Sequence, residues 1–361
     1  MSLARGAVSG RVVIPHARPR LGGDEEAAAL RVLRSGRFAP GAEAARLEAI
    51  MARLSGTADA VAVSSGTMAL TLALRALGLG PRDDVAIPSY CCAAVLHAVR
   101  AAGSRPRICD IDPETLAIDP EDLTRRSGGA PRAVVLVHPF GVPIPIEPFR
   151  ARGLLVIEDC CQALGAADRG HPVGARGDAA VFSFAPTKMV TGGGPGGALA
   201  ATQAGVVRIA RDLAGHDEKE EDRPRWNGLM GDLHAAIVAV QLGRLREFRE
   251  RRAALASRYD AAFASMPIGR PKVPAGVMAV AGRYLIRLRG AQDLREQLEA
   301  RGVIARRPVF RPLHRLLGLK ESFPATNAAH EEMLSLPIGA SFSDAEIDRV
   351  IEEVRRCRPS P

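Results

Sequence analysis

Three groups in this chain could do chemistry together: an amine, a carboxylate and a helix N-terminus. Lys188 follows the short segment 182–187 and precedes the glycine-rich segment 191–197. Asp159 ends an apolar run, and the small residues 64–67 precede a helical pattern. A single lysine is usually a solvated surface charge. An amine, a carboxylate and a phosphate-binding helix terminus, found together, are the parts that a pyridoxal phosphate site requires.

The lysine segment contains two candidate groups. Lys188 would form a Schiff base with the aldehyde of the cofactor and later move the substrate proton. Ser183 lies between Phe182 and Phe184, so alternation along a strand could direct its hydroxyl to the cofactor phosphate and the two rings to the core. A serine bonded to nearby backbone explains Ser183 alone equally well. The glycines after Lys188 would let the backbone pass close to a ligand.

Glu158 and Asp159 end an apolar run that we expect to be a strand. Alternation should turn only one of the two carboxylates to the ligand side, and we favour Asp159. A carboxylate that faces the pyridine nitrogen keeps the ring protonated and therefore electron-withdrawing. The other interpretation is a carboxylate that caps the following turn. Gln162 could bond the phenolic oxygen of the ring or only the backbone.

The tripeptide Ser65, Gly66 and Thr67 follows a predicted strand and begins a predicted helix. Unpaired backbone N–H groups and the positive end of the helix dipole make such a position favourable for a phosphate. For the tripeptide alone, an ordinary N-cap is the simpler interpretation.

Short apolar runs alternate with helical patterns from residue 59 to residue 200, which predicts a mostly parallel sheet with helices on both faces. Ligands of such sheets bind beyond the carboxyl ends of the strands. Ser64, Pro88, His138 and Asp159 lie at predicted strand ends, so they could share one edge. The expected strands are residues 60–63, 85–87, 107–111, 133–137 and 154–157, and the expected helices are residues 68–77 and 93–102.

The pattern changes after about residue 205. We divide the chain into a large cofactor-binding domain, residues 1–245, and a smaller C-terminal α+β domain, residues 246–361. The elements expected in this second half are a helix at 206–214, a solvated charged loop at 217–225, one long helix or two joined helices at 233–263, a strand at 284–288, and helices at 291–301 and at 344–356, the last after a Ser343 cap.

The composition and charge of the chain limit the classes of ligand and partner that it can bind. The chain has 361 residues, enough for a large core, and a net charge of +9 from 49 basic and 40 acidic residues. An anionic ligand, a nucleic acid and a merely arginine-rich composition all fit this charge. Basic and aromatic residues are not interleaved, so we expect no nucleic-acid binding. No apolar stretch reaches the length of a membrane span, and residues 1–11 lack the apolar core of a signal peptide.

Six cysteines occur, four of them in the adjacent pairs Cys91 with Cys92 and Cys160 with Cys161. Neighbouring cysteines bridge poorly, and there is no C-x-x-C pair that would indicate zinc binding or dithiol redox chemistry. We therefore expect reduced thiols, a cytoplasmic location and no metal site.

Five motifs follow one another along the chain: SSGTMALTLALRALGLGPRDDVAIPSY, CDIDPETLAIDPEDL, VIEDCCQALGA, the block from VGARGD to FSFAPTK, and RWNGLMGDLHAAIVAVQLGRL. With this order the chain resembles the DegT-type sugar aminotransferases, a family of fold-type I pyridoxal phosphate enzymes related to aspartate aminotransferase. Each motif alone is modest, but five in order are highly specific. A weaker likeness continues through RPVFRPLH and LSLPIGASFSDAEIDRVI.

The resemblance implies a fold-type I architecture and assigns roles to individual residues. Lys188 would be the Schiff-base lysine, and Asp159 would be the partner of the pyridine nitrogen. A homodimer with two shared active sites follows from the same resemblance, because Asn227 matches an asparagine that reaches the phosphate from the neighbouring subunit. The other residues placed at the cofactor are Gln162 beside the ring, Gly66, Thr67 and Ser183 at the phosphate, and Cys92 above the ring.

Four positions depart from the family pattern. Cys92 stands where many relatives place an aromatic ring, and the segment TGGGPGG lacks the usual glutamate. Leu229 replaces a basic residue two places after Asn227, and Ala185 replaces a residue that is commonly larger or polar. The core chemistry survives these changes, but they weaken any inference about the substrate.

Transamination is the leading functional hypothesis. An amino acid such as glutamate would load the cofactor with an amino group, which would then pass to a keto-sugar, nucleotide-linked, in glycan or secondary-metabolite biosynthesis. His314 and Arg306 or Arg307 could contact substrate anions, although surface or fold-stabilising roles fit them at least as well. We expect His138 to be structural.

Three alternatives stay open. The first is pyridoxal phosphate-dependent dehydration of a sugar, but relatives of that kind carry histidine in place of the lysine, so Lys188 argues against it. The second is amination of a ketone that is not a sugar. The third is a non-catalytic binding or regulatory protein that keeps the fold.

Overall fold

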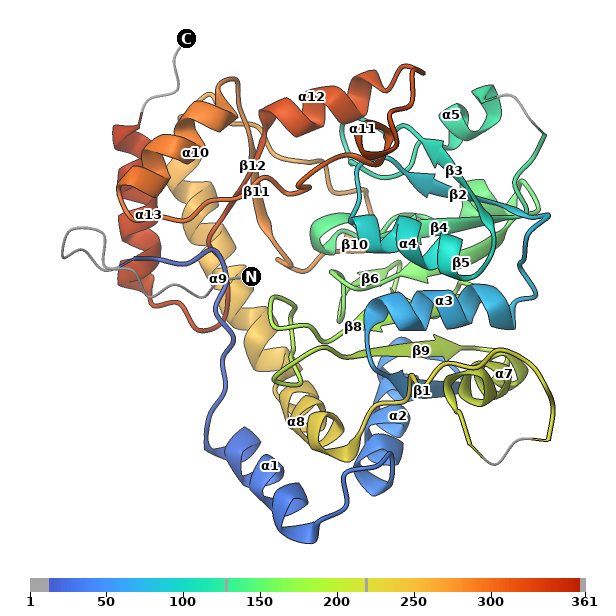
Figure 1. The fold of residues 1–361 in the computed structure, drawn as a ribbon. Helices are drawn as coiled ribbons and strands as arrows, with labels where there is room; N and C mark the ends of the chain where they lie inside the picture. Colours follow the sequence, from blue (N-terminus) through green and yellow to red (C-terminus); the bar gives the residue numbers. More distant parts are fainter. Residues whose placement is uncertain (1–12, 127–128, 218–219, 358–361) are drawn as a thin grey trace.

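The computed structural model describes residues 13–126, 129–217 and 220–357, and a seven-stranded sheet lies at its centre (Figure 1). β9 runs antiparallel to both of its neighbours, β1 and β8, and the other pairs are parallel. This is the mostly parallel sheet that the sequence predicts. Across the sheet the strands are β1 (Asp59–Val63), β9 (Gly197–Ala201), β8 (Ala179–Ser183), β5 (Leu155–Asp159), β4 (Ala133–Val137), β2 (Asp84–Pro88) and β3 (Arg105–Cys109).

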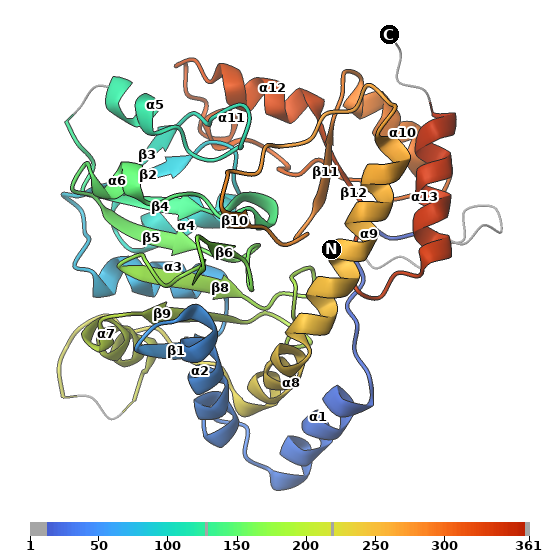
Figure 2. The same ribbon diagram turned by 180° about the vertical axis from the view of Figure 1, so that it is seen from behind.

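Helices cover both faces of this sheet (Figures 1 and 2), which is why its strands read as continuous apolar runs. One face packs against α3 (Gly66–Ala76), α4 (Ala93–Ala101) and α7 (Ala204–Ala214). The other face packs against α2 (Ala42–Ser55), α5 (Pro120–Arg125), α6 (Glu147–Arg150) and α8 (Asp232–Gly243). α1 (Gly23–Ser35) packs on the outer side of α8.

A second, smaller core lies in the C-terminal part of the chain. Its sheet is the antiparallel pair β11 (Tyr284–Arg287) and β12 (Met333–Leu336), and its helices are α9 (Leu245–Phe263), α10 (Ala291–Ala300) and α13 (Asp344–Arg356). The predicted cap of α13 is present as a capping box between Ser343 and Glu346. Ile14, from the opposite end of the chain, packs into this core and bridges to Val303.

The long helical region is two helices rather than one. Arg244 separates α8 from α9 with φ −101° and ψ 6°. Leu245 and Phe248 at the start of α9 pack with the large sheet, whereas Leu255 and Phe263 belong to the smaller core. α9 therefore connects the two cores, and the exact division at residue 245 stays a prediction.

Short elements complete the fold. A small three-stranded sheet contains β6 (Ala167–Asp168), β7 (His171–Pro172) and β10 (Val277–Met278). A 3-10 turn (Pro139–Gly141) follows β4, and α11 (Leu313–Leu317) and α12 (Pro324–Glu332) precede β12. The described part of the charged segment 217–225 has no helix or strand, and residues 1–11 lie outside the described chain. Of the helices described, none is both long and apolar enough to cross a membrane.

Candidate functional site

One large cavity opens at the carboxyl edge of the central sheet. Its volume is about 1160 Å³, and it is lined by the loops that follow β1, β2, β4, β5 and β8 together with residues of the C-terminal part. His138 and Asp159 line it directly, and Ser64 and Pro88 precede loops that line it. The predicted common edge is present because the strands that carry these residues run parallel.

The N-terminus of α3 forms one wall of the cavity, to which Ser65, Gly66 and Thr67 all contribute. Ser65 is the N-cap, and its Oγ accepts the backbone N–H of Met68 at 3.1 Å. The cap uses one donor of the first turn. The N–H groups of Gly66 and Thr67 have no partner within the helix, so capping and phosphate binding are compatible at this terminus.

Glycines allow α3 to lie close to the sheet. A Cβ at Gly197 would come within 2.5 Å of the carbonyl carbon of Ser65 and 2.6 Å of the nitrogen of Gly66. A Cβ at Gly66 would meet Cβ of Ser183 at 3.0 Å and Sγ of Cys161 at 3.2 Å. The sequence predicts that the glycine-rich segment lets the backbone pass close to a ligand. In the structure, the atoms closest to Gly197 belong to the N-terminus of α3.

Glu158 does not line the cavity and has a structural role. Its carboxylate accepts the backbone N–H groups of Gly174, Arg176 and Gly177 at 2.9, 3.1 and 2.6 Å. Nε2 of His138 lies 3.0 Å from the same carboxylate. Burial raises the pKa of Glu158, but the bonds from His138 and the backbone outweigh burial and hold that pKa below its usual value.

Asp159 is turned to the cavity, as alternation along β5 predicts. Its Oδ1 accepts the N–H of Cys161 at 3.0 Å, so the carboxylate also fixes the following turn. Asp159 therefore has both expected features: it faces the ligand side, and it caps the turn that follows β5.

His138 accepts the N–H of Ile144 on Nδ1, so Nε2 carries the proton that is donated to Glu158. This arrangement matches the structural role expected for His138.

Lys188 lies in the loop after β8, where its N–H donates to the carbonyl of Ala185 at 2.9 Å. The side chain is half-buried and lines the cavity, and it forms no ion pair with any described carboxylate. Ser183 also lines the cavity, and the rings of Phe182 and Phe184 on either side of it are buried in the core. The amine, the carboxylate of Asp159 and the α3 terminus thus face one space.

Two further predicted residues line the same cavity. Oε1 of Gln162 is buried and has no hydrogen-bond partner within the described chain. Such an orphaned group costs about 1–3 kcal/mol, so a ligand that bonds the Gln162 amide would be stabilising. Cys92 is exposed at the N-cap of α4, and its side chain makes no capping bond.

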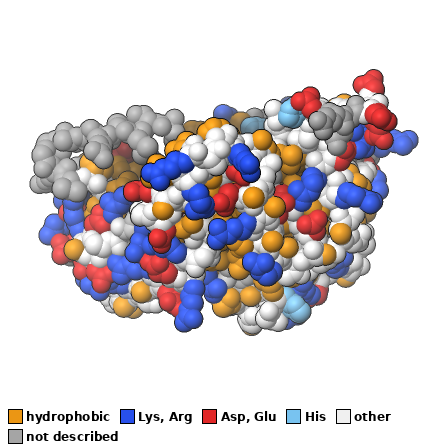
Figure 3. Space-filling view, turned by 90° about the horizontal axis from the view of Figure 1, so that it is seen from below, with side chains coloured by type: hydrophobic (Ala, Val, Ile, Leu, Met, Phe, Trp, Pro, Cys, Tyr) orange, Lys and Arg blue, Asp and Glu red, His pale blue; other side chains and the backbone are white. Residues whose placement is uncertain are grey.

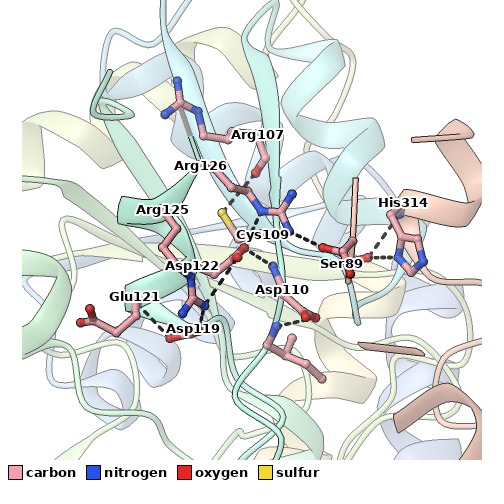
Figure 4. Close-up of polar contacts among 12 residues, drawn as sticks. Ser89, Arg107, Cys109, Asp110, Asp119, Glu121, Asp122, Arg125, Arg126 and His314 are labelled. Atoms are coloured by element: carbon pink, nitrogen blue, oxygen red, sulfur yellow. Dashed lines mark hydrogen bonds and ion pairs between the residues drawn. The ribbon is translucent and has the colours of Figure 1, made fainter. Parts of the chain in front are cut away.

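The structure corrects the prediction for His314. This histidine is buried, does not line the cavity, and has Nδ1 2.7 Å from Oγ of Ser89 (Figure 4). Its Nε2 lies 3.2 Å from Oδ1 of Asn327. The RPLH motif is recognisable in sequence, but the turn that follows Pro312 directs the ring into the protein. His314 is a structural residue rather than a substrate contact.

Arg306 and Asn227 lie at different places. Arg306 lines the cavity, is exposed and lies 3.9 Å from Glu299. Asn227 is exposed and does not line the cavity of its own chain. Its expected contact with the neighbouring subunit stays a prediction.

Several cavity residues were not predicted from the sequence, among them Arg283 and His16. Arg283 directly precedes the predicted strand of the C-terminal part, and this position was the only available signal. No sequence pattern indicated His16, because its position depends on the bridge between Ile14 and Val303 at opposite ends of the chain.

The comparisons with known proteins agree with this geometry. The model of the DegT/DnrJ/EryC1/StrS aminotransferase family matches residues 19–355. The chain is 33% identical over 348 residues to dTDP-3-amino-3,4,6-trideoxy-alpha-D-glucose transaminase of Streptomyces venezuelae, a match that covers 92% of this chain and 91% of the relative. It is 30% identical over 339 residues to UDP-N-acetyl-3-dehydro-alpha-D-glucosamine 3-aminotransferase of Acidithiobacillus ferrooxidans, covering 90% and 91%.

Among solved structures, the aminotransferase TlmJ from Streptoalloteichus hindustanus superimposes with a TM-score of 0.89 at 33% identity, covering 95% of this chain and 98% of that one. The matched region includes Lys188, Asp159 and the whole of the central sheet. The chain therefore belongs to the DegT/DnrJ/EryC1/StrS aminotransferase family.

Proposed function

We propose that this protein transfers an amino group from an amino acid such as glutamate to the ketone of a nucleotide-linked sugar. Aminotransferases of its family depend on pyridoxal phosphate. The observation that carries the proposal is the convergence of Lys188, Asp159, Gln162 and the N-terminus of α3 on one cavity.

The cavity residues fit this cofactor. Backbone N–H groups of Gly66 and Thr67, with the hydroxyl of Ser183, provide donors for the phosphate. Asp159 would keep the pyridine nitrogen protonated, and the Nε2 group of Gln162 would donate to the phenolic oxygen. Pyridoxal phosphate, when bound, supplies an electrophilic carbon and an electron sink.

Lys188 has two tasks in this proposal. Its Nζ holds the cofactor covalently between turnovers. In the half-reaction with the amino donor Nζ takes the proton from the α-carbon, and in the half-reaction with the acceptor it returns a proton to the sugar carbon. The side chain can move between these tasks because no described carboxylate holds it in an ion pair.

Two observations support a nucleotide-linked acceptor. The relatives from Streptomyces venezuelae and Acidithiobacillus ferrooxidans act on dTDP- and UDP-linked sugars according to their names. The cavity, at about 1160 Å³, exceeds the roughly 300–1,000 Å³ typical of sites for small ligands. We place the product in glycan or secondary-metabolite biosynthesis. Lys188 disfavours the dehydratase alternative.

We also propose a cytoplasmic homodimer with shared active sites, in which Asn227 reaches the phosphate of the neighbouring subunit. Asn227 is exposed, and Phe310, which lines the cavity, is 93% exposed in the single chain. Leu30 and Leu33 of α1 are also exposed, and apolar side chains lie among the charged ones on the face drawn in Figure 3. All six cysteines are free, which supports a reducing compartment.

Covalent capture of the cofactor and product analysis test the function. Borohydride reduction should fix pyridoxal phosphate on Lys188 of the wild type, and peptide mass spectrometry locates the attachment. Lys188→Ala should lose the attachment and at least about 10³-fold in turnover while remaining folded. Amination of dTDP- or UDP-linked keto-sugars should appear as a new amine by mass spectrometry. Normal turnover by Lys188→Ala, or no aminated product with any keto-sugar, would contradict the proposal.

A further inference from the structure

The C-terminal part gives the cavity a basic wall. Among the described residues that line the cavity, Asp159 is the one carboxylate. The cationic side chains that line it are Lys188 and the five arginines Arg283, Arg295, Arg306, Arg307 and Arg311. With its one carboxylate facing the proposed pyridine site, the cavity lining has a net positive charge that attracts the anions of substrates.

Arg283, like Arg307 and Arg311, forms no ion pair with a described carboxylate, and burial sets it apart from those two. Its guanidinium donates to the carbonyl of Pro308 at 3.1 Å, and no described carboxylate lies within ion-pair distance. Arg295 and Arg306, in contrast, both lie 3.9 Å from Glu299. Burial lowers the pKa of Arg283, as expected for a cation that is desolvated without a counter-ion. A cation in this situation destabilises the empty protein, which indicates a ligand.

The backbone before Arg283 is fixed against the loop that follows β4. The N–H of Val280 donates to the carbonyl of Gly141 at 2.9 Å, and the N–H of Arg283 donates to the carbonyl of Phe140 at 3.2 Å. Gly141 has φ +105°, and a Cβ there would come within 2.0 Å of the carbonyl oxygen of Val280. Only glycine permits this close approach.

The same segment touches the proposed cofactor site. A Cβ at Gly282 would come within 2.4 Å of the carbonyl oxygen of Gln162. From the opposite side, the buried Arg252 donates to the carbonyls of Ala281 and Gly282 at 3.0 and 3.3 Å. Arg283 is therefore a preorganised cation whose backbone neighbour is in contact with Gln162.

The pKa of His16 reflects the positive charge of this wall. Its Nε2 lies 2.9 Å from Oγ of Ser335, and the residue lines the cavity. Burial, followed by the positive charges of Arg283, Arg306 and Arg252, lowers the pKa of His16 to about 3. The low pKa keeps this histidine neutral, and no carboxylate of the described chain forms an ion pair with it.

We propose that Arg283 binds the carboxylate of the amino donor and of its 2-oxo-acid product. The planar guanidinium offers paired N–H groups that match both oxygens of a carboxylate. The α-carboxylate is attached to the reacting carbon, and Arg283 lies next to the segment that contacts Gln162. Arg306 and Arg311 are exposed, and the guanidinium of Arg307 donates to Nε2 of His330 at 2.9 Å. This inference rests on the proposed transamination. The other anion that enters the cavity is the diphosphate of the acceptor.

Equilibrium binding of unreactive anions tests the inference. Glutarate and maleate, and separately UDP and dTDP, are titrated into the full-length protein loaded with its cofactor. Arg283→Met should weaken dicarboxylate binding roughly 10- to 100-fold and leave nucleotide binding unchanged. Arg289→Met is the matched control, because Arg289 is exposed and does not line the cavity. Unchanged dicarboxylate affinity in Arg283→Met, or a loss confined to the nucleotides, would overturn the inference.

A second variant excludes a folding artefact. Arg283→Lys keeps the charge but cannot form the paired bonds, so it should keep the thermal midpoint of the wild type and still lose several-fold in dicarboxylate affinity. If Arg283→Met does not fold, Arg283→Lys decides: full dicarboxylate affinity in that variant overturns the inference. If the wild type binds dicarboxylates through Arg283 but aminates no nucleotide-linked sugar, the donor site stands and the proposed acceptor is wrong.

Discussion

The hydroxyl of Ser89, just after β2, lies 2.7 Å from Nδ1 of His314 in α11 (Figure 4). Oγ of Ser89 also accepts the backbone N–H of His314 at 3.2 Å, so the hydroxyl proton is directed to Nδ1. Nε2 then carries the ring proton and donates to Asn327 at 3.2 Å. This chain of bonds requires a neutral imidazole and joins the large sheet to the segment containing α11 and α12. Ser89 is fully buried, which excludes it as a nucleophile.

Removal of the His314 ring should therefore reduce stability rather than substrate binding. His314→Ala loses two side-chain bonds and the stacked contact with Phe323, whose ring centroid lies 4.5 Å away. We expect about 2–4 kcal/mol of destabilisation in denaturant unfolding, with KM for both substrates within a few-fold of the wild type. His97→Ala, at an exposed position of α4, is the control. An increase in KM without a change in stability would restore the substrate role for His314.

Buried histidines should make the protein sensitive to mild acid. Burial is the main cause that lowers the pKa of His16 to about 3, of His330 to about 4, and of His314 in the same direction. Above the unfolded pKa of about 6.5 all three are neutral in both states and cost nothing. As the pH falls below that value the unfolded chain binds protons first, so each histidine removes up to about 1.4 kcal/mol of stability per pH unit until its folded pKa is reached.

Unfolding in denaturant at pH 7.5, 6, 5 and 4.5 measures this slope. His330→Gln should reduce the pH dependence of the unfolding free energy between pH 6.5 and pH 4 by up to about 1.4 kcal/mol per pH unit. Above pH 7 it should change this pH dependence little. The variant is informative because Nε2 of His330 accepts from Arg307 at 2.9 Å, which fixes its neutral form. A slope that is identical in the variant and the wild type would show that His330 protonates equally in both states.

The neighbours Glu158 and Asp159 should respond in opposite ways to loss of charge. Glu158→Gln places an amide against three backbone donors and His138, so we expect a loss of about 2–4 kcal/mol in stability. Asp159→Asn should change stability little and should lower turnover by at least about 10²-fold, because the pyridine nitrogen loses its counter-charge. Thermal unfolding and initial rates separate the two effects. Equal effects of the two substitutions on turnover would contradict the assignment of Asp159.

The sequence predicts local elements well where one pattern dominates. The strand at residues 133–137 and the helix at residues 344–356 are present with the predicted bounds, because continuous apolar runs and a serine cap identify them. β9 was missed, because Gly197 and the alanines after it lack the branched residues typical of strands. Its glycine is needed for the approach of α3, a contact between distant segments that local patterns do not encode.

The site was predictable to the extent that its residues end strands or begin helices. Asp159, Ser183 and Gly66 lie at such positions, and parallel pairing brings them to one edge. Arg283 and the burial of His314 depend on how the C-terminal part packs on the sheet. These contacts are set by packing between remote segments, so no spacing along the chain reveals them.

Gly197 offers a test of the link between sheet packing and cofactor binding. A Cβ at this position would lie 2.5–2.6 Å from backbone atoms of Ser65 and Gly66, and rotation of a side chain cannot relieve contacts with backbone. Gly197→Ala should therefore displace the N-terminus of α3, reduce stability by about 1–3 kcal/mol and weaken pyridoxal phosphate binding at least about 10-fold. Equilibrium dialysis of the cofactor and thermal unfolding measure the two effects.

The matched control for this prediction is Gly205→Ala, in the first turn of α7, where a Cβ would meet no atom within 4 Å. This substitution should leave cofactor affinity unchanged and should keep or slightly raise stability, because alanine loses less backbone entropy than glycine in a helix. The comparison separates a general glycine-to-alanine effect from the specific clash at the phosphate site. Wild-type cofactor affinity in Gly197→Ala would mean that the α3 terminus does not hold the phosphate, and the donors at Ser183 would then have to carry that role.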